Sequence, residues 1–322
     1  MSYVIGVDGG GSQTCAVVAD KSGRFISSGK SQGSNHQIIG VELALSRIQE
    51  SIQNALRAAG KTPHEVDFVQ YGLAGADRET DLKILSEALV ALPYRRWAVV
   101  SDAWEGLRAG TDNGIGVSVV CGSGTNAVGR NAHGLEVQIG GFGYAFGDMA
   151  GGHQLALETF RAAVRSYQHR APETQLTREL PAYLGFENMD AVYNYFLDHH
   201  PPIPLSLSLL VHQLAALGDK VCQDILASMG RELGLAANAV IEQLGGTCDQ
   251  EIPIVLVGGI VQKGRSPALL EALRETVTTH FSGASLQQLD VPPVYGAVLL
   301  ALDHLGIPAD SGAKATFQRW GK

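Results

Sequence analysis

The sequence has few of the features that mark secreted, membrane-spanning or zinc-binding proteins. It contains four cysteines, Cys15, Cys121, Cys222 and Cys248, and no two of them form a C-x-x-C pair. We therefore expect a reduced, cytoplasmic protein with neither disulfides nor a structural zinc. No apolar run reaches the ~18 residues of a membrane-spanning helix. A basic region followed by an apolar one is missing at the N-terminus, so no signal peptide is expected.

Charged residues are also scarce, and the balance is acidic. Asp, Glu, Lys and Arg make up 17% of the 322 residues, and the formal net charge is −8. Without a long basic cluster, the sequence argues against a nucleic-acid partner. Hydrophobic residues reach 45%, which is typical of a globular rather than a disordered chain. A chain of this length can bury a large core, and two domains are expected.

What the sequence has in abundance is glycine, and the first glycine cluster follows an apolar run near the N-terminus. Asp8 ends that run, and the turn after it consists of Gly9, Gly10, Gly11, Ser12, Gln13 and Thr14. A second apolar run follows, so the pattern predicts a strand, a tight turn and a strand. A Rossmann turn would lead into a helix instead, and the P-loop spacing is absent.

Such a turn can bind phosphate. Glycines let the backbone approach a ligand closely, and backbone N–H groups and hydroxyls can surround phosphate oxygens. The carboxylate of Asp8 at the strand end can hold Mg²⁺ directly or through water. The alternative is a glycine-rich hairpin without a ligand, in which Asp8 merely starts the turn.

The apolar pattern predicts the same order of elements, βββαβαβα, twice. In the first half the elements are expected at residues 4–7, 16–19, 24–28, 38–59, 66–73, 81–91, 97–101 and 103–109. In the second half, after a helix-rich insert at about 150–244 is set aside, they are expected at 115–120, 127–130, 135–139, 252–257, 267–281, 285–289 and 295–305. We therefore predict two lobes, residues 1–114 and 115–322, with the last helix packing back on the first lobe.

Two further glycine turns fall at related places in the second half. Gly122, Ser123, Gly124 and Thr125 lie between its first two strands, and Gly258-Gly259 follows the strand at 252–257. Ligands of open α/β sheets bind beyond the carboxyl ends of the strands. If the halves face each other, two phosphate-binding turns flank one cleft, and Gly258 and Gly259 can approach a base or ribose.

Several short motifs together resemble a known family. They lie at residues 4–14, 33–36, 73–77, 101–103, 122–126, 140–148 and 257–259. Their order resembles the BadF/BadG/BcrA/BcrD group of the actin-like ATPase and sugar-kinase superfamily, and within it the N-acetylglucosamine kinase-like proteins. The resemblance implies an α/β fold of two actin-like, ribonuclease H-like lobes around a central cleft for ATP and substrate.

The resemblance also implies an activity, namely ATP-dependent phosphorylation of an amino sugar similar to N-acetylglucosamine, at the 6-hydroxyl. ATP and Mg²⁺ are the expected cofactors and a homodimer is the expected assembly. Asp102 is the candidate general base, because a carboxylate at a strand end can accept the proton of the attacking hydroxyl. It is also expected to hold the sugar. The alternative role of Asp102 is to cap the helix that follows it.

The remaining sugar-binding residues are implied by the resemblance. They are Asn35, whose alternative role is a helix cap, Asn126, Asp148, and a wall near the N-acyl group formed by Gly141, Phe142 and Gly143. One position departs from the family pattern: many relatives have Glu where this chain has Met149. The loss of that carboxylate leaves open which amino sugar, or which other hydroxyl compound, is the substrate.

Two other functions stay open. Some members of the group are activator ATPases of radical dehydratases or reductases, which hold an iron–sulfur cluster between two subunits with cysteines. Here only Cys121 is expected near the centre. The other possibility is a sensor that binds sugar or nucleotide without turnover. The apolar helices after residue 150 are interpreted as core, with a dimer face as a second use.

Overall fold

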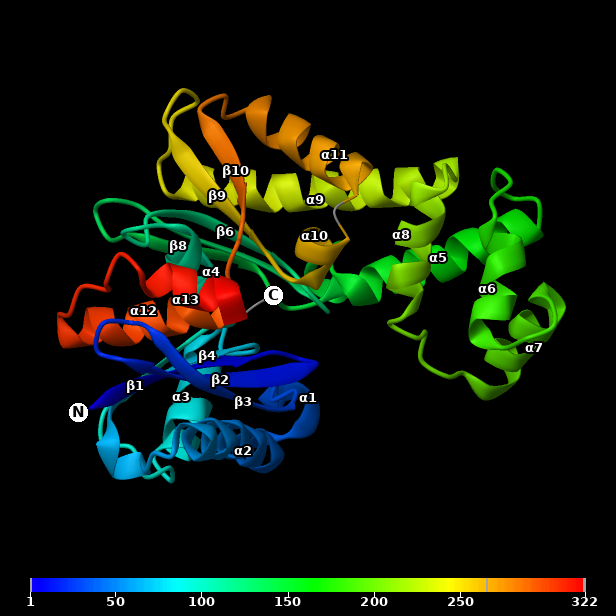
Figure 1. The fold of residues 1–322 in the computed structure, drawn as a ribbon. Coiled ribbons are helices and arrows are strands. Elements are labelled where there is room, and N and C mark those ends of the chain that lie inside the picture. The colour runs from blue at the N-terminus through cyan, green and yellow to red at the C-terminus, as the bar shows by residue number, and fades with distance from the viewer. Residues whose placement is uncertain (1, 265, 321–322) are drawn as a thin grey trace.

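The computed structural model describes residues 2–264 and 266–320, and two five-stranded sheets organise them (Figure 1). The first sheet has the order β3-β2-β1-β4-β5. Its strands are β1 (Tyr3–Gly9), β2 (Gln13–Asp20), β3 (Phe25–Gln32), β4 (Val66–Leu73) and β5 (Trp97–Val100). β2 is antiparallel to β1 and to β3, whereas β4 is parallel to β1 and to β5.

The second sheet repeats this topology. Its order is β10-β9-β6-β7-β8. Its strands are β6 (Gly116–Cys121), β7 (Thr125–Arg130), β8 (Glu136–Gly140), β9 (Ile252–Val257) and β10 (Ala284–Gln288). β7 is antiparallel to β6 and β8, and β9 is parallel to β6 and β10. Each half therefore places a hairpin on one side of its first strand and two parallel strands on the other, and its strands follow one another along the chain in the order that the sequence pattern predicts.

Helices cover the outer face of each sheet. In the first half these elements are α1 (His36–Ile39), α2 (Val41–Ala59), η1 (Pro63–Glu65) and α3 (Glu79–Leu89). α2 turns a stripe of apolar side chains, among them Ile48 and Ile52, onto β1, β2 and β3, and it ends at Gly60 in the left-handed conformation with φ 64°. On the second sheet the outer face is covered by α9 (Lys220–Gln243).

Helices also lie between the two sheets (Figure 1). α4 (Asp102–Gly110) follows β5 and packs on β1 and β4 of the first sheet and on β6, β7 and β9 of the second. α12 (Val294–Leu305) comes late in the chain, yet it packs on β1, β4 and α4. A Cβ on Gly296 would lie 1.9 Å from the backbone oxygen of Glu105, so this glycine lets the two helices touch.

The insert between β8 and β9 is helical. It contains η2 (Tyr144–Phe146), α5 (Gly152–Tyr167), α6 (Leu176–Leu184), α7 (Met189–His199), α8 (Leu207–Ala216) and α9. Figure 1 shows α6 and α7 at the end of the molecule that is farthest from the first sheet. α10 (Gly259–Lys263) and α11 (Pro267–Thr278) follow β9, and α11 packs along α9. No helix in the described ranges combines the length and the apolar character needed to span a membrane.

The chain ends its described part with α13 (Ala313–Trp320), which the sequence pattern did not indicate. Phe317 of α13 is completely buried and contacts the rings of Phe25 and Tyr295 at centroid distances of 5.6 and 4.7 Å. The helix thus joins β3 of the first sheet to α12.

We expect Phe317→Ala to lower the free energy of unfolding by about 3 kcal/mol, because it leaves a cavity in a packed aromatic cluster. The matched control is Phe146→Ala at a residue that is 79% exposed, where loss of the ring should cost less than about 0.5 kcal/mol. Chemical denaturation followed by circular dichroism measures both. Equal effects of the two substitutions would show that α13 is not part of the folded core.

Candidate active site

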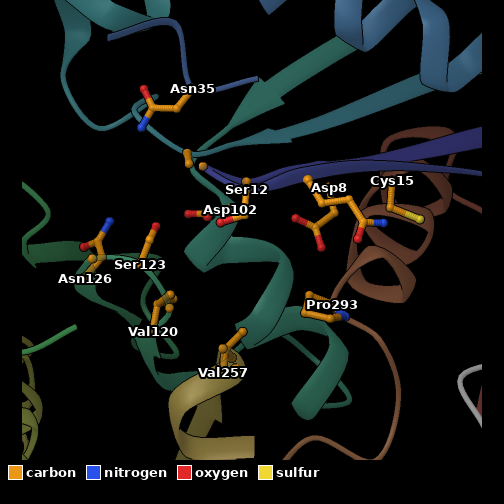
Figure 2. Close-up of a pocket in the computed structure, with 18 of the residues that line it drawn as sticks. Asp8, Ser12, Cys15, Asn35, Asp102, Val120, Ser123, Asn126, Val257 and Pro293 are labelled. Carbon is orange, nitrogen blue, oxygen red and sulfur yellow. The ribbon is translucent and has the colours of Figure 1, made fainter. Parts of the chain in front are cut away.

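A cavity of about 620 Å³ lies between the two sheets and is lined by all three glycine turns. Gly10–Ser12 follow β1, Gly122–Thr125 follow β6, and Gly258 and Gly259 follow β9. Each turn stands at the carboxyl end of its strand, where open α/β sheets bind ligands. Figure 2 shows Ser12 from the first half and Ser123 from the second among the residues that line this space.

The two hairpin turns are tight and face each other. The N–H of Gly10 donates to the oxygen of Gln13 (3.0 Å), and that of Gly122 donates to the oxygen of Gly124 (2.9 Å). A Cβ on Gly11 would lie 3.0 Å from Oγ of Ser123, so the opposing turns come almost into contact. The remaining N–H groups and hydroxyls of both turns are therefore placed around one small volume, as a phosphate-binding site requires.

Two carboxylates face the same cavity (Figure 2). Asp8 lies at the end of β1, and Asp102 is the first residue of α4. Burial raises the pKa of Asp8 to about 6. Burial, followed by the negative charges of Asp8 and Asp77, raises the pKa of Asp102 to about 7. Ser101 occupies the N-cap position of α4, so Asp102 is not the cap residue. A carboxylate that titrates near neutral pH is suited to accept and release a proton.

A third carboxyl group, Glu105, lies one helical turn after Asp102. It is completely buried, and neither of its carboxyl oxygens has a hydrogen-bond partner among the described residues. A Cβ on Gly72 would lie 1.4 Å from its Oε1, and Gly72 is paired with Asp8 in the β1–β4 ladder. Burial, together with the charges of Asp8 and Asp102, holds the pKa of Glu105 well above its usual range. The only sign of this residue in the sequence is its spacing from Asp102.

Asp77 joins the two halves of the site. Its Oδ1 accepts hydrogen bonds from Oγ of Ser101 (2.9 Å), Nδ2 of Asn126 (2.9 Å) and Nε2 of Gln138 (3.0 Å). Asp77 and Ser101 follow strands of the first sheet, whereas Asn126 and Gln138 lie on β7 and β8 of the second. The motif at residues 73–77 contains Asp77, but nothing in it indicates this role.

Asn35 lines the cavity and also caps a helix. Its Oδ1 accepts the N–H of Gln37 (3.0 Å) at the start of α1. The two roles suggested by the sequence are therefore compatible, because the amide nitrogen is not used by the cap. Gln37 lines the cavity as well, and its side chain donates to the oxygen of Gly75 (3.2 Å).

Two residues of the first predicted phosphate turn do not line the cavity. Thr14 is completely buried, and its hydroxyl lies 2.9 Å from the oxygen of Gln32 and 2.8 Å from Oγ of Ser34. A Cβ on Gly9 would lie 2.6 Å from both Leu73 and Ser34. Both residues therefore support the turn from behind.

Asp148, Phe142 and Gly143 also lie outside this cavity, whereas Gly141 and Asn126 line it. Oδ2 of Asp148 accepts the N–H groups of Gly141 (3.1 Å), Phe142 (2.7 Å) and Gly143 (2.5 Å). In the described structure this carboxylate is thus occupied in holding the loop between β8 and α5.

The cavity has further lining residues that the motifs do not indicate. Lys30 on β3 is paired with Cys15 on β2, and both line the cavity near Asp8. Lys30 is the one Lys or Arg among its described lining residues. Trp320 and Pro293 also line the cavity.

Comparison with known proteins places the chain among ATPases and kinases. A family model described as the BadF/BadG/BcrA/BcrD ATPase family matches residues 5–301. An N-acetyl-D-glucosamine kinase of Dictyostelium discoideum is 28% identical over 315 residues, which is 93% of this chain and 97% of the relative. An N-acetylmuramic acid/N-acetylglucosamine kinase of Clostridium acetobutylicum is 27% identical over 304 residues, covering 94% and 98%.

A solved structure from Chromobacterium violaceum, described as a candidate N-acetylglucosamine kinase, has the same fold. It superimposes with a TM-score of 0.75 at 22% identity, over 94% of this chain and 99% of that one. The predicted family resemblance and the predicted two-sheet α/β fold are both confirmed by these matches and by the sheet topology.

The raised pKa of Asp102 predicts how stability depends on pH. Its pKa is 3.8 in an ordinary setting and about 7 in the folded chain, so the folded state retains a proton that the unfolded state releases between these values. The stabilisation that this retained proton provides is fully present below the unfolded-state pKa and is lost as pH rises through the folded-state pKa.

We therefore expect that Asp102→Asn changes the free energy of unfolding more favourably at pH 8 than at pH 5, by about 1–2 kcal/mol. Urea denaturation at the two pH values measures this difference. Asp198→Asn, on the exposed side of α7, is the control and should show no comparable pH dependence. Equal effects of Asp102→Asn at both pH values would contradict the burial of a titrating carboxylate.

Proposed function

Because the chain belongs to the BadF/BadG/BcrA/BcrD ATPase family, we propose that it transfers the γ-phosphoryl group of ATP to an amino sugar such as N-acetylglucosamine. The family implies the use of ATP, and the two curated relatives above are named as kinases of N-acetylglucosamine or N-acetylmuramic acid. The observation that carries the proposal is the pair of glycine turns that face each other across a cavity containing Asp102.

Phosphoryl transfer depends mainly on positioning and on electrostatic stabilisation. The N–H groups and hydroxyls at 10–12 and 122–125 hold the phosphates of ATP between the two halves. Gly258, where a Cβ would lie 2.4 Å from the backbone oxygen of Cys121, lets the turn after β9 pack closely on the end of β6. Gly259 faces open space, and the nucleotide lies against the backbone of both glycines. Gly9 and Thr14 keep the first turn in shape.

Asp102 acts as the general base. It accepts the proton of the sugar hydroxyl, proposed to be the 6-hydroxyl, as that oxygen attacks the γ-phosphorus. Its pKa of about 7 means that a substantial fraction is ionised at neutral pH. The same carboxylate fixes the orientation of the attacking hydroxyl by hydrogen bonding.

The residues present fit Mg²⁺ bound together with the nucleotide. Across the described ranges, no three His, Cys, Asp or Glu side chains form a group that could enclose a metal ion. Mg²⁺ commonly takes one or two protein carboxylates and completes its shell with phosphate oxygens and waters. Asp8, which faces the cavity beside the first turn, would hold it directly or through water. When bound, Mg²⁺ offsets negative charge on the phosphates.

The sugar is held on the side of the cavity where Asn35, Asn126 and Gly141 lie. Asp77 fixes the amide nitrogen of Asn126, while Oδ1 of Asn126 is buried without a partner among the described residues and is free to accept a sugar hydroxyl. The loop that Asp148 holds in shape, with Phe142 and Gly143, forms the wall near the N-acyl group. Asp148 thus acts by positioning this loop.

Nothing in the described structure favours the activator function. Cys121 is completely buried, and its Sγ lies 3.9 Å from Sδ of Met229 inside the second core. Burial raises the pKa of this thiol to about 12. A cluster shared between two subunits needs accessible thiolates, and this thiol offers none. A sensor would bind sugar or nucleotide without releasing ADP, so a measurement of turnover distinguishes it from a kinase.

The organisation of the chain is part of the same proposal. We infer two lobes, residues 1–114 and 115–322, with the insert at about 150–244 in the second lobe and the helix at 295–305 associated with the first. The homodimer and the cytoplasmic location are likewise proposed from the sequence and the family resemblance.

We expect sugar-dependent release of ADP from Mg·ATP, with N-acetylglucosamine among the active sugars. Asp102→Asn should lower kcat by about 10²–10⁴-fold, the range that a general base contributes, while nucleotide binding persists. A coupled ADP assay and equilibrium binding of a fluorescent ATP analogue give the two readouts, with Asp198→Asn as the control. ATP binding without sugar-stimulated turnover in the wild type would contradict the kinase and favour the sensor.

Asp77→Ala tests whether the link between the sheets supports sugar binding. It leaves the amides of Asn126 and Gln138 and the hydroxyl of Ser101 without their shared acceptor, and an unsatisfied buried group costs about 1–3 kcal/mol. We therefore expect KM for the sugar to rise by about tenfold or more, with a smaller change in KM for ATP. Steady-state kinetics with each substrate varied measures this difference. An equal rise in both KM values would indicate general loosening of the fold.

A further inference from the structure

A second cavity, of about 290 Å³, adjoins the first one. Thr125 and Asn126 line both cavities. The second cavity lies between the loop that follows β8 and the side of α9, and its apolar lining includes Phe142, Met149 and Leu235. The proposed function uses Phe142 and the loop held by Asp148 as the wall near the N-acyl group, but it gives no role to the side of this space that α9 forms.

Asn126 connects the second cavity to the reacting groups. Oγ of Ser101 lies 3.4 Å from Oδ1 of Asp102 and 3.4 Å from Nδ2 of Asn126. Asn126 is only 7% exposed, and its Oδ1 has no partner among the described residues. A hexose whose attacking hydroxyl met Asp102 would lie beside Asn126, which also lines the second cavity.

The polar lining of the second cavity is acidic. Asp148 and Glu232 line it, and its described lining residues include no Lys, Arg or His. Oδ2 of Asp148 is compensated by three backbone N–H groups. Glu232 lies on α9 and is partly buried, and the described part of the chain provides its carboxylate with no hydrogen bond or ion pair. An entering group therefore meets an uncompensated negative charge.

Glu232 and Met149 line the same cavity but belong to different elements. Met149 follows Asp148 in the loop, whereas Glu232 comes from α9, more than eighty positions later in the numbering of the chain. The carboxylate of Glu232 therefore reaches this space from α9, an element far from the loop in the sequence. Its charge bears on which substituents the cavity accepts.

We propose that the second cavity receives the substituents of the amino sugar that lie away from the phosphorylated hydroxyl, and that Glu232 selects uncharged or cationic sugars over sugars that carry a carboxylate. A substrate carboxylate placed beside Glu232 is opposed by like charge, and the described lining residues include no cation to offset it. Such repulsion is an effective means of specificity. This inference rests on the proposed function and narrows its substrate class.

The test compares three sugars with Mg·ATP: N-acetylglucosamine, N-acetylmuramic acid, which carries a lactyl carboxylate, and the methyl ester of N-acetylmuramic acid. The ester keeps the size of the lactyl group and removes its charge. We expect the wild type to use the ester at least about fivefold better than the acid, as kcat/KM, because two like charges at contact distance are worth about that factor or more.

Glu232→Gln should raise the acid-to-ester ratio of kcat/KM by about fivefold, and Glu232→Lys should raise it further. Higher salt should reduce the wild-type discrimination, because it screens the repulsion. The matched control is Glu242→Gln, an exposed position on the same helix that does not line the cavity, and it should leave the ratio at its wild-type value.

Calorimetric binding of the same three sugars, with a non-hydrolysable ATP analogue present, separates this inference from the kinase itself. Equal use of acid and ester, or a ratio unchanged by Glu232→Gln, would overturn the inference and leave the kinase intact. Binding that follows the charge order without any ADP release would support the selection and overturn the kinase. Failure of the wild type to bind any of the three sugars would overturn both.

Discussion

The meeting of the two sheets at one carboxylate is the constraint on which the candidate site depends. Oδ1 of Asp77 receives hydrogen bonds from Ser101 of the first half and from Asn126 and Gln138 of the second. Charge-assisted bonds of this kind are directional and stronger than neutral ones, so they fix orientation as well as distance. Asp102 directly follows Ser101, and Asn126 lines both cavities. The position of one sheet relative to the other therefore also sets the distance between the proposed base and the proposed sugar site.

The three buried carboxyl groups at the bottom of the cavity lower the stability of the fold, but the proposed chemistry requires carboxylates there. Asp8, Asp102 and Glu105 come close together where burial disfavours their charged forms, and the pKa of each is raised. The fold accommodates them with small residues: Gly72 makes room for Glu105, and Gly296 lets α12 support the backbone of α4. Strain of this type is common where a site is arranged for function rather than for stability.

Local patterns predicted most of the fold, because strands, glycine turns and amphipathic helices depend on residues that are close together in the sequence. The repeated order of elements, the three turns at strand ends and the place of Asp8 beside the cavity follow from such patterns. Asn35 was assigned to the cavity by the family resemblance, which also favoured Asp102 as the base. The part played by Asp77 could not be predicted, because its partners lie on strands whose relative position is set only when the sheets meet. The same holds for Asp148, whose carboxylate turns back to its own loop, and for α13, which is too short to show a clear period.

The most direct test of the account is a crystal structure of the chain with a non-hydrolysable ATP analogue and N-acetylglucosamine. The account predicts that the γ-phosphorus lies between the turns at 10–12 and 122–125, with a sugar hydroxyl within hydrogen-bonding distance of the Asp102 carboxylate and in line with that phosphorus. A nucleotide bound away from these turns, or a sugar whose hydroxyls all lie beyond the reach of Asp102, would contradict it.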